Sequence, residues 1–375
     1  MYKECIQLTR QFAFCPNAFR VDTYKGCDMG CRYCFANMEW NRDLSNNWDF
    51  ADMKKIEYVF KRALDRDRES KDILVELIRH RVPIHCGGMS DPFQSREWTC
   101  ELTYRLIELS NKYNYPVQFS TKADFLDEKY YKVLNPDIHA FQLSVMGYDD
   151  DYIRKWERNT PTAKQRLEFA KELKKRGFWV GIRIQPIIDI SQVVKLCYNL
   201  DRNVNYVTLE HIKSQTAVTQ TMETLNSYYT QDELDRLFYI NHAKLEMRKH
   251  IREENIRQIK VILNGKGIKV GVGDNDLHYM SDTRCCCGTD TINSNFDNYM
   301  KYNLTYCCTG KSDTDTFIPK TNPRKNINDK KYGLVIDCKQ YVDDYITEHI
   351  DYCGDRKNEV INELGLKIVR PKKLF

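Results

Sequence analysis

Three cysteines, Cys27, Cys31 and Cys34, stand at the spacing C-x3-C-x2-C directly after a short strand-like run at 19–24. A loop with three thiolates can bind three irons of a cubane iron–sulfur cluster and leave the fourth iron without a protein ligand. An open iron can bind a small molecule, which a purely structural site does not need. Gly26 and Gly30 let the loop fold closely around an inorganic core, because glycine has no side chain to collide with it.

Two simpler interpretations of these thiols stay open. Structural zinc usually takes four ligands in two paired half-sites, and no neighbouring fourth ligand is evident near this loop. The cysteines could also be ordinary buried thiols without a metal. The motif favours iron–sulfur chemistry over both.

The composition is that of a globular protein. The chain has 375 residues, of which 42% are hydrophobic and 30% charged, which allows one large domain or two ordinary ones. A net charge of +5 permits a polyanionic partner without requiring one. The 15 cysteines are odd in number and clustered, which favours metal binding over a disulfide scaffold. The start of the sequence lacks a signal-peptide pattern, and no run of ~18 apolar residues occurs, so we expect a cytoplasmic protein without a membrane span.

Strand-like and helix-like runs alternate along the first part of the chain. The expected strands are 19–24, 82–88, 116–122, 139–145, 178–184 and 204–212, and the expected helices include 50–65, 96–113, 162–176 and 191–200. Apolar strands joined by helices indicate a parallel sheet that is buried on both faces. Six such units are too few for a complete eight-stranded barrel, so the sequence predicts an α/β fold with a partial (β/α)6 TIM-type barrel.

We expect three regions: an N-terminal arm at 1–18, the partial barrel at 19–215, and a cysteine-rich C-terminal extension at 216–375 that covers the barrel mouth. Within this extension, 230–254 has the apolar pattern of a charged helix, and 268–272 has that of one more strand. Active sites of such barrels lie at the carboxyl ends of the strands, where the cysteine loop would meet polar strand-end residues.

A second group of cysteines lies within the extension, at 285–287 and 307–308. Adjacent cysteines point in different directions, so not all five can bind one ion. We predict a second metal site from Cys285, Cys287, Cys307 and Cys308, either an auxiliary iron–sulfur cluster or zinc. A thiol-rich loop without metal is the alternative.

The loop at 24–36 resembles the cluster loop of the radical S-adenosylmethionine (SAM) superfamily. The segments 87–94, 120–122, 142–145, 156–162 and 182–188 resemble, in order, those of its spore photoproduct lyase-like subgroup. The resemblance implies that Cys27, Cys31 and Cys34 hold a [4Fe-4S] cluster whose open iron binds SAM. It also implies that Tyr33 packs near the adenine, and that reductive cleavage of SAM yields a 5′-deoxyadenosyl radical that abstracts hydrogen from a substrate.

The same resemblance implies further contacts with SAM. A glycine pair matches the turn that lets the amino group of SAM approach the backbone, and three polar residues match positions that contact SAM. Two more polar residues belong to the matching fifth-strand segment. These seven residues are Gly87, Gly88, Ser90, Lys122, Ser144, Arg183 and Gln185.

One departure from the subgroup concerns a catalytic cysteine. In the lyase a cysteine donates hydrogen two residues before the serine that matches Ser90, and that position holds Gly88 here. Cys86 lies two residues earlier, on the same strand face, and is the candidate substitute. A cysteine on a barrel strand is more often a small core residue. We therefore do not predict photoproduct repair.

Three functions follow as hypotheses. The first is a radical SAM enzyme that repairs or modifies a nucleic acid, favoured by the subgroup resemblance, the mild positive charge and the basic tail at 367–373. The second is a radical SAM enzyme that modifies a peptide or protein with the help of an auxiliary iron–sulfur cluster. The third is a zinc-bearing nucleic-acid-binding module without catalysis. For the enzymes, the resemblance implies SAM and an electron donor such as flavodoxin or ferredoxin as partners.

Overall fold

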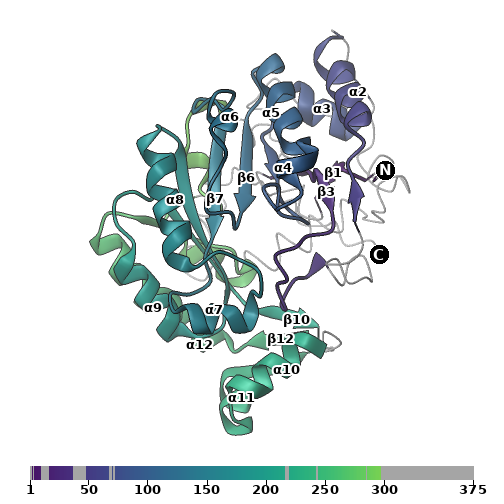
Figure 1. The fold of residues 1–375 in the computed structure, drawn as a ribbon. Helices are drawn as coiled ribbons and strands as arrows, with labels where there is room; N and C mark the ends of the chain where they lie inside the picture. Colours follow the sequence, from purple (N-terminus) through teal and green to yellow (C-terminus); the bar gives the residue numbers. More distant parts are fainter. Residues whose placement is uncertain are drawn as a thin grey trace, which may run out of the picture.

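The structure, a computed structural model, describes residues 2–296 apart from 3, 10–16, 37–47, 67–69, 71, 216–218, 242–243 and 284. At its centre lies an eight-stranded sheet in the order β1-β2-β5-β6-β7-β8-β9-β13 (Figure 1). The strands are β1 (Ile6–Leu8), β2 (Phe19–Val21), β5 (Ile84–Cys86), β6 (Val117–Thr121), β7 (His139–Ser144), β8 (Trp179–Ile187), β9 (Tyr206–His211) and β13 (Lys269–Val272). β1 is antiparallel to β2, and every other neighbouring pair is parallel.

This architecture confirms the predicted α/β fold with a partial barrel. From β2 onward the strands lie in chain order, which is the arrangement of a barrel rather than of a doubly wound sheet. All six predicted strands are present, and β13 corresponds to the further strand expected at 268–272. In the described part of the chain no pairing joins β13 to β1, so the sheet does not close there.

The register gives the sheet two chemically different faces. Residues paired side by side share a face, and successive residues along a strand alternate between faces. One face, here called the polar face, carries Arg20, His85, Gln118, Ser120, Gln142, Arg183 and Thr208. The other, the apolar face, carries Val21, Cys86, Phe119, Phe141, Leu143, Ile182 and Val207, and it packs with the apolar residues of the helices in one core. The polar face therefore lines the interior of the barrel.

Helices connect the strands. They are α2 (Met53–Leu64), α3 (Ile73–Arg79), α4 (Glu97–Cys100), α5 (Leu102–Tyr113), α6 (Glu128–Tyr131), α7 (Asp150–Trp156), α8 (Ala163–Lys175) and α9 (Ile190–Asn199). The predictions at 50–65, 162–176 and 191–200 are confirmed by α2, α8 and α9. The single helix predicted at 96–113 is divided into α4 and α5, because Glu101 between them has a left-handed φ of 54°. No helix in the described residues is long and apolar enough to cross a membrane.

The prediction of one charged helix at 230–254 is wrong. The chain forms α11 (Gln231–Leu237), the hairpin strands β11 (Phe238–Asn241) and β12 (Lys244–Met247), and then α12 (Lys249–Gly265). Leu234, Leu237 and Phe238 have helical spacing, which produced the prediction. In β12, however, Leu245 and Met247 are buried and the residues before them are not, which is the alternation of a strand.

The first part of the extension lies beside the cysteine loop. Strand β10 (Lys213–Gln215) pairs with β12 in a three-stranded sheet, and α10 (Thr219–Tyr228) lies next to it (Figure 1). Arg32, between the second and third loop cysteines, donates from Nη1 to Thr224 Oγ1 at 3.1 Å, and its carbonyl accepts from Thr221 Oγ1 at 2.9 Å. The extension therefore contacts the loop at this end of the barrel.

The second part of the extension lies at the opposite end. Tyr206, the first residue of β9, donates its hydroxyl to the carbonyl of Cys285 at 2.8 Å, and Trp179, the first residue of β8, donates from Nε1 to Thr291 Oγ1 at 3.2 Å. Asn293 and Asn295 donate to the carbonyl of Asp137, just before β7, at 3.0 and 2.9 Å. Residues 285–296 thus close the amino ends of the strands, whereas we expected them over the barrel mouth. Sequence spacing does not reveal at which end of a barrel a late segment returns.

Gly271 of β13 tests how tightly this closing segment packs. A Cβ at Gly271 would lie 2.3 Å from the Tyr206 hydroxyl oxygen and 2.4 Å from the Cys286 carbonyl oxygen, so Gly271→Ala must displace backbone. We expect a loss of about 1–3 kcal/mol in the free energy of unfolding, measured by urea denaturation. Gly265→Ala is the control, because a Cβ there meets nothing within 4 Å. Equal stability of the two variants would contradict the packing described here.

Candidate functional site

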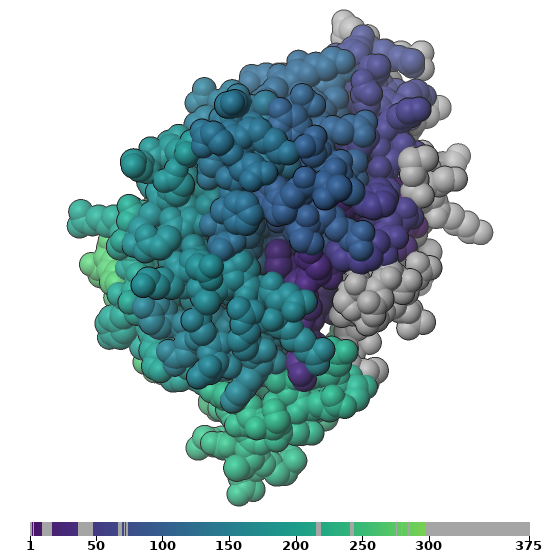
Figure 2. Space-filling model, in the orientation of Figure 1, coloured from purple at the N-terminus to yellow at the C-terminus, as the bar shows by residue number. Residues whose placement is uncertain are grey.

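The loop with Cys27, Cys31 and Cys34 follows β2 and the short strand β3 (Tyr24–Lys25), which pairs with β4 (Asp49–Phe50). All three cysteines are partly exposed, and none is in a disulfide. Figure 2 shows this purple part of the chain at the bottom of a hollow between blue and teal residues. The loop therefore stands at the carboxyl end of the sheet with its thiols accessible.

Two side-chain amides from neighbouring connections, the buried Gln94 and the exposed Asn159, anchor the loop backbone. Gln94 donates from Nε2 to the Gly26 carbonyl at 3.2 Å, and its Oε1 accepts from the Asp28 amide at 3.3 Å. Asn159 donates from Nδ2 to the Asp28 carbonyl at 2.8 Å and from its backbone amide to the Met29 carbonyl at 3.2 Å. The path of the loop is thus fixed by contacts to its backbone between the first two cysteines.

The residues present fit a [4Fe-4S] cluster. Three soft thiolate donors come from one loop, and a cubane takes each thiolate on a different iron, so the three sulfurs need not converge on one point. Among the residues that the structure describes, no group of three or more His, Cys, Asp or Glu side chains is placed to hold a single metal ion. Gly30 has a left-handed φ of 63°, and a Cβ there would press on the Asn159 side chain at 3.2 Å. The tight turn between Cys27 and Cys31 therefore depends on glycine.

A buried carboxylate, Glu157, lies beneath the loop. Burial alone would raise the pKa of Glu157, but the positive charges of Lys122 and Arg166 outweigh it and bring the pKa down to about 2. Lys122 Nζ lies 3.3 Å from Oε1, and Arg166 Nη1 lies 3.0 Å from Oε2. The Tyr33 hydroxyl also donates to Glu157. The carboxylate is therefore ionised at neutral pH, balanced by two cations, and it holds the aromatic residue beside the last loop cysteine.

Glu157 also contacts the loop through its backbone, because it forms an isolated antiparallel bridge with Cys31. Glu157 lies in the segment 156–162, which resembles the lyase-like subgroup, but it is not among the predicted site residues. Arg166, Gln94 and Asn159 are not among them either. The available signal was the pair of Glu157, just after α7, and Arg166, near the start of α8. Acidic and basic residues at such a spacing are common on protein surfaces.

Several predicted SAM-binding residues surround the same end of the sheet. Ser90 is buried and donates its hydroxyl to the Tyr24 carbonyl at 2.6 Å. Gly87 has φ of 98°, and a Cβ there would lie 2.2 Å from the Ser120 carbonyl oxygen. Asp91 accepts from the backbone amide of Lys122 at 2.7 Å. The structure thus brings the turn after β5 and the end of β6 next to the cysteine loop.

The other predicted residues lie further along the sheet. The Ser144 carbonyl accepts from Arg166 Nη1 at 2.6 Å. Arg183 points into the barrel from the polar face, where its Nη2 lies 3.2 Å from Glu210 Oε2 and its Nε donates to Gln185. Gly88 packs against Arg20, whose Cδ would lie 3.1 Å from a Cβ at that position. Roles of these residues toward SAM stay predictions.

Cys86, the predicted catalytic residue, does not face the barrel interior. It lies in the row of the apolar face formed by Val21, Phe119 and Phe141, and its exposed fraction is 0%. His85, its neighbour, occupies the interior position of β5. The structure therefore corrects the candidate: Cys86 is a small residue of the core between sheet and helices.

The interior contains ionisable residues that sequence analysis missed. Burial lowers the pKa of His85 to about 3, with further lowering by Arg183 and Arg20, and its Nε2 lies 2.8 Å from Ser120 Oγ. Burial raises the pKa of Glu210 to about 7, although Arg183 opposes this shift. We call the space bordered by His85, Arg183 and Glu210 the polar chamber. Glu210 follows an apolar strand run, which gives no signal that its side chain points inward.

The second cysteine group is only partly described. Cys307 and Cys308 lie outside the described residues, so a second metal site stays a prediction. Cys285 Sγ lies 3.6 Å from Thr289 Oγ1, and Cys287 Sγ accepts from Asn17 Nδ2 at 3.3 Å. Both sulfurs therefore lie at the amino ends of the strands, away from the cysteine loop.

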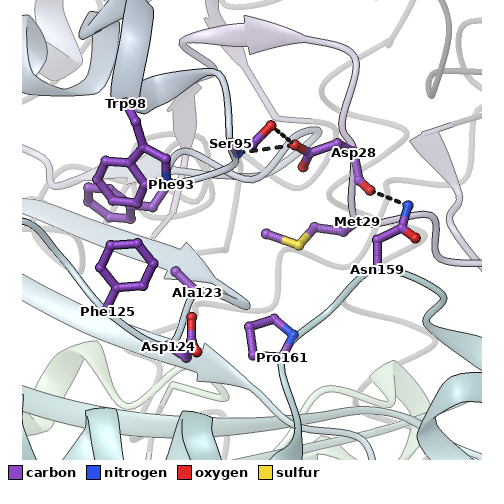
Figure 3. Close-up of a pocket in the computed structure, with 10 residues that line it drawn as sticks. All are labelled: Asp28, Met29, Phe93, Ser95, Trp98, Ala123, Asp124, Phe125, Asn159 and Pro161. Atoms are coloured by element: carbon purple, nitrogen blue, oxygen red, sulfur yellow. Dashed lines mark hydrogen bonds between the residues drawn. The ribbon is translucent and has the colours of Figure 1, made fainter.

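A cavity of about 440 Å³ borders the loop on its outer side (Figure 3). Asp28 and Met29, which lie between the first two cysteines, form one wall, and Trp98 and Phe125 stack with ring centroids 5.0 Å apart on another. Asp28 accepts from the Ser95 amide at 3.1 Å, which joins the loop to the connection before α4. The cavity gives another molecule an approach to the cysteine loop.

The Glu157 network has a measurable effect on stability. Glu157→Gln removes the charge that balances Lys122 and Arg166 in a buried site, so we expect a loss of about 3–5 kcal/mol in the free energy of unfolding at neutral pH. The folded-state pKa lies below the usual 4.5, so this contribution is complete above about pH 4.5 and is lost as the pH falls toward 2. Urea denaturation across this pH range measures both effects.

The matched control is Glu168→Gln, which removes an exposed pair with Lys171 at 2.8 Å. Such a pair contributes about 0–1 kcal/mol, so this variant should unfold almost as the parent does. A pH-independent difference between the parent and Glu157→Gln would show that folding does not lower the pKa of Glu157.

Solved structures of spore photoproduct lyase have a similar fold. A mutant of spore photoproduct lyase with bound AdoMet and dinucleoside spore photoproduct is 15% identical over 69% of this chain and 78% of its own, with a TM-score of 0.52. Spore photoproduct lyase complexed with dinucleoside spore photoproduct gives the same values. SuiB from Streptococcus suis bound to the precursor peptide SuiA is 16% identical over 56% of this chain and 45% of its own, with a TM-score of 0.38. No curated protein sequence matches the chain.

The family assignment rests on the sequence of the barrel. The family model of the Radical SAM superfamily matches residues 21–194, which include the cysteine loop, the turn after β5, Lys122 and Glu157. The partial barrel, with its cysteine loop at the carboxyl ends of the strands, agrees with this match. Residues 21–194 therefore match the radical SAM superfamily in sequence, and the fold of these residues agrees with that match.

Proposed function

We propose that Cys27, Cys31 and Cys34 hold a [4Fe-4S] cluster at which the enzyme cleaves SAM reductively and so starts hydrogen abstraction from a substrate. The observation that carries this proposal is the anchored loop of three accessible cysteines at the carboxyl end of the sheet. When bound, the cluster supplies one-electron reduction of SAM at its open iron.

The surrounding residues position the cofactors in this proposal. Glu157, fixed by Lys122 and Arg166, orients Tyr33, which would lie along the adenine. Lys122 would attract the carboxylate of SAM while it keeps its contact with Glu157. The turn at Gly87 brings backbone groups close to the loop, because no side chain fits there. Together these residues would hold SAM between the loop and the polar chamber.

An electron donor such as a flavodoxin or ferredoxin is part of the proposal. The loop borders a cavity on its outer side and reaches the surface in Figure 2, so a donor can approach this side while the substrate occupies the barrel interior. Separate approaches let reduction occur without displacement of the substrate.

We propose a nucleic acid as the substrate class. The fold likeness to spore photoproduct lyase, the net charge of +5 and the basic tail at 367–373 support this proposal. A peptide or protein substrate is the second candidate. It would gain support if the cysteines at 285–287 and 307–308 held an auxiliary cluster, which is a proposal of its own.

The cofactor proposal predicts the behaviour of a triple variant. After anaerobic reconstitution, the parent should carry about four irons per chain at the loop and should form 5′-deoxyadenosine from SAM and dithionite. The variant with Cys27, Cys31 and Cys34 all changed to Ala should lose these irons and the product. Iron analysis and chromatography of the nucleoside measure the two outcomes.

Cys100→Ala is the control, because Cys100 is also partly exposed but lies in α4. It should keep iron and activity. Iron that stays in the triple variant would point to the second cysteine group. Zinc in the parent, without nucleoside formation, would overturn the enzyme mechanism in favour of a binding module.

The substrate proposal predicts salt-dependent binding. Binding to single- or double-stranded DNA or RNA should weaken at least tenfold between about 50 and 200 mM salt, because each phosphate contact releases counterions. A variant with Lys367, Lys372 and Lys373 changed to Gln should show a smaller salt slope. Fluorescence anisotropy with labelled oligonucleotides measures both. Binding that is absent, or that does not change with salt, would leave the peptide substrate as the better proposal.

A further inference from the structure

The amino-terminal end of the polar chamber is closed by three consecutive cysteines, and the sulfurs of two of them lie close together. Cys286 Sγ is 3.7 Å from Cys287 Sγ. We propose that Cys286 and Cys287 form a redox-active dithiol that closes reversibly to a disulfide at the floor of the chamber. This site is separate from the loop of Cys27, Cys31 and Cys34. The idea that a substrate occupies the polar chamber rests on the proposed function, and the disulfide does not.

The position of Cys286 allows a small reagent to reach it. Cys285 and Cys287 are 1% and 3% exposed, whereas Cys286 is partly exposed. The backbone carbonyl of Cys286 accepts from Thr208, a residue of the polar face, so Cys286 lies at the amino-terminal end of that face. Cys286 is therefore the more accessible thiol of the pair, and Cys287 is the buried one.

The barrel wall holds the backbone of the pair in place. Thr208 Oγ1 donates to the Cys286 carbonyl at 2.7 Å, and Gln118 Nε2 donates to the Cys287 carbonyl at 3.3 Å. Both donors stand on the polar face, on strands β9 and β6. These contacts hold the two carbonyls in the structure, and closure of a disulfide between adjacent residues must also distort the peptide that joins them.

Cys285 is less suited to pair with either neighbour. Its sulfur accepts from the Cys287 amide at 3.3 Å and lies 3.6 Å from Thr289 Oγ1. These contacts direct it toward the backbone turn at 287–289. The sulfurs of Cys286 and Cys287 are 3.7 Å apart, and we assign the disulfide to this pair.

A low-molecular-weight disulfide is the class of oxidant that fits this site. The Cys286 sulfur attacks one sulfur of the reagent, and the first reagent thiol leaves. Cys287 then attacks the Cys286 sulfur of this mixed disulfide, and the second reagent thiol leaves. The two protein thiols are oxidised, the reagent is reduced by two electrons, and the two protons end on the two released thiols.

Such a disulfide should be easily reversed. Adjacent residues have Cα atoms only ~3.8 Å apart, below the roughly 4.4–6.8 Å usual for a disulfide. Strained disulfides are more readily reduced than unstrained ones. The reduced pair therefore offers an accessible thiol at Cys286, and the oxidised pair does not.

The chain offers a direct test. Trypsin cleaves after Arg284 and Lys301, and the peptide between them contains Cys285, Cys286 and Cys287 and no other cysteine. The full chain is treated anaerobically with oxidised glutathione, alkylated with N-ethylmaleimide, digested and analysed by mass spectrometry. We expect this peptide to carry one alkyl group and to lack two hydrogens, and to regain three alkyl groups after dithiothreitol.

Three serine variants assign the bond. Cys285→Ser should still form the disulfide, whereas Cys286→Ser and Cys287→Ser should not. Cys287→Ser should instead accumulate glutathione on Cys286, because the resolving thiol is missing. Serine is close in size to cysteine, and circular dichroism verifies that each variant is folded.

Two results would overturn the proposal. One is a parent peptide in which all three cysteines stay alkylated, or a disulfide that involves Cys285. The other is iron or zinc bound to the parent and lost in Cys286→Ser. The variant with Cys27, Cys31 and Cys34 changed to Ala should form the same disulfide as the parent, so failure of the cluster proposal and failure of this one are distinguishable.

Discussion

One buried charge fixes the region around the cysteine loop. Glu157 has a fully buried side chain, and such a carboxylate is tolerable only when cations compensate the lost hydration. Lys122 comes from the end of β6 and Arg166 from α8, so the pairing requires both elements to meet the segment after α7. The Tyr33 hydroxyl and the backbone bridge to Cys31 attach the loop to the same point. The position of the loop therefore depends on charge balance as much as on apolar packing.

The two faces of the sheet have different roles: the apolar face contributes to stability, and the polar face carries the ionisable groups. The apolar face supplies the core with the helices, and it includes Cys86, which has no route to the interior. The polar face places Arg183, His85 and Glu210 in the barrel. Burial there lowers the pKa of His85 and raises the pKa of Glu210, so it favours the neutral form of both side chains. A substrate in this space would meet hydrogen-bonding groups with little net charge apart from the arginines.

The sequence allowed correct prediction of the barrel strands and the partial barrel, because apolar runs are local signals. It did not allow prediction of the hairpin at 238–247, where three apolar residues happen to have helical spacing. Nor did it reveal the partners of Glu157, since Lys122 and Arg166 meet it only through tertiary packing. Cys86 was wrongly placed at the site. Period-two alternation shows which residues of a strand share a face, but it does not show which of the two faces lines the barrel interior.

The location of residues 285–296 gives the barrel two different ends. At the carboxyl ends of the strands stands the loop for the proposed cluster, beside a cavity open to other molecules. At the amino ends, the backbone or sulfurs of Cys285–Cys287 accept hydrogen bonds from Asn17, Gln118, Thr208 and Tyr206. This end is therefore covered by protein. In the described part of the chain, the cavity lies at the other end, beside the cysteine loop. The segment that covers the amino ends therefore also carries the thiols of the proposed dithiol, and the strands carry the groups that hold its backbone.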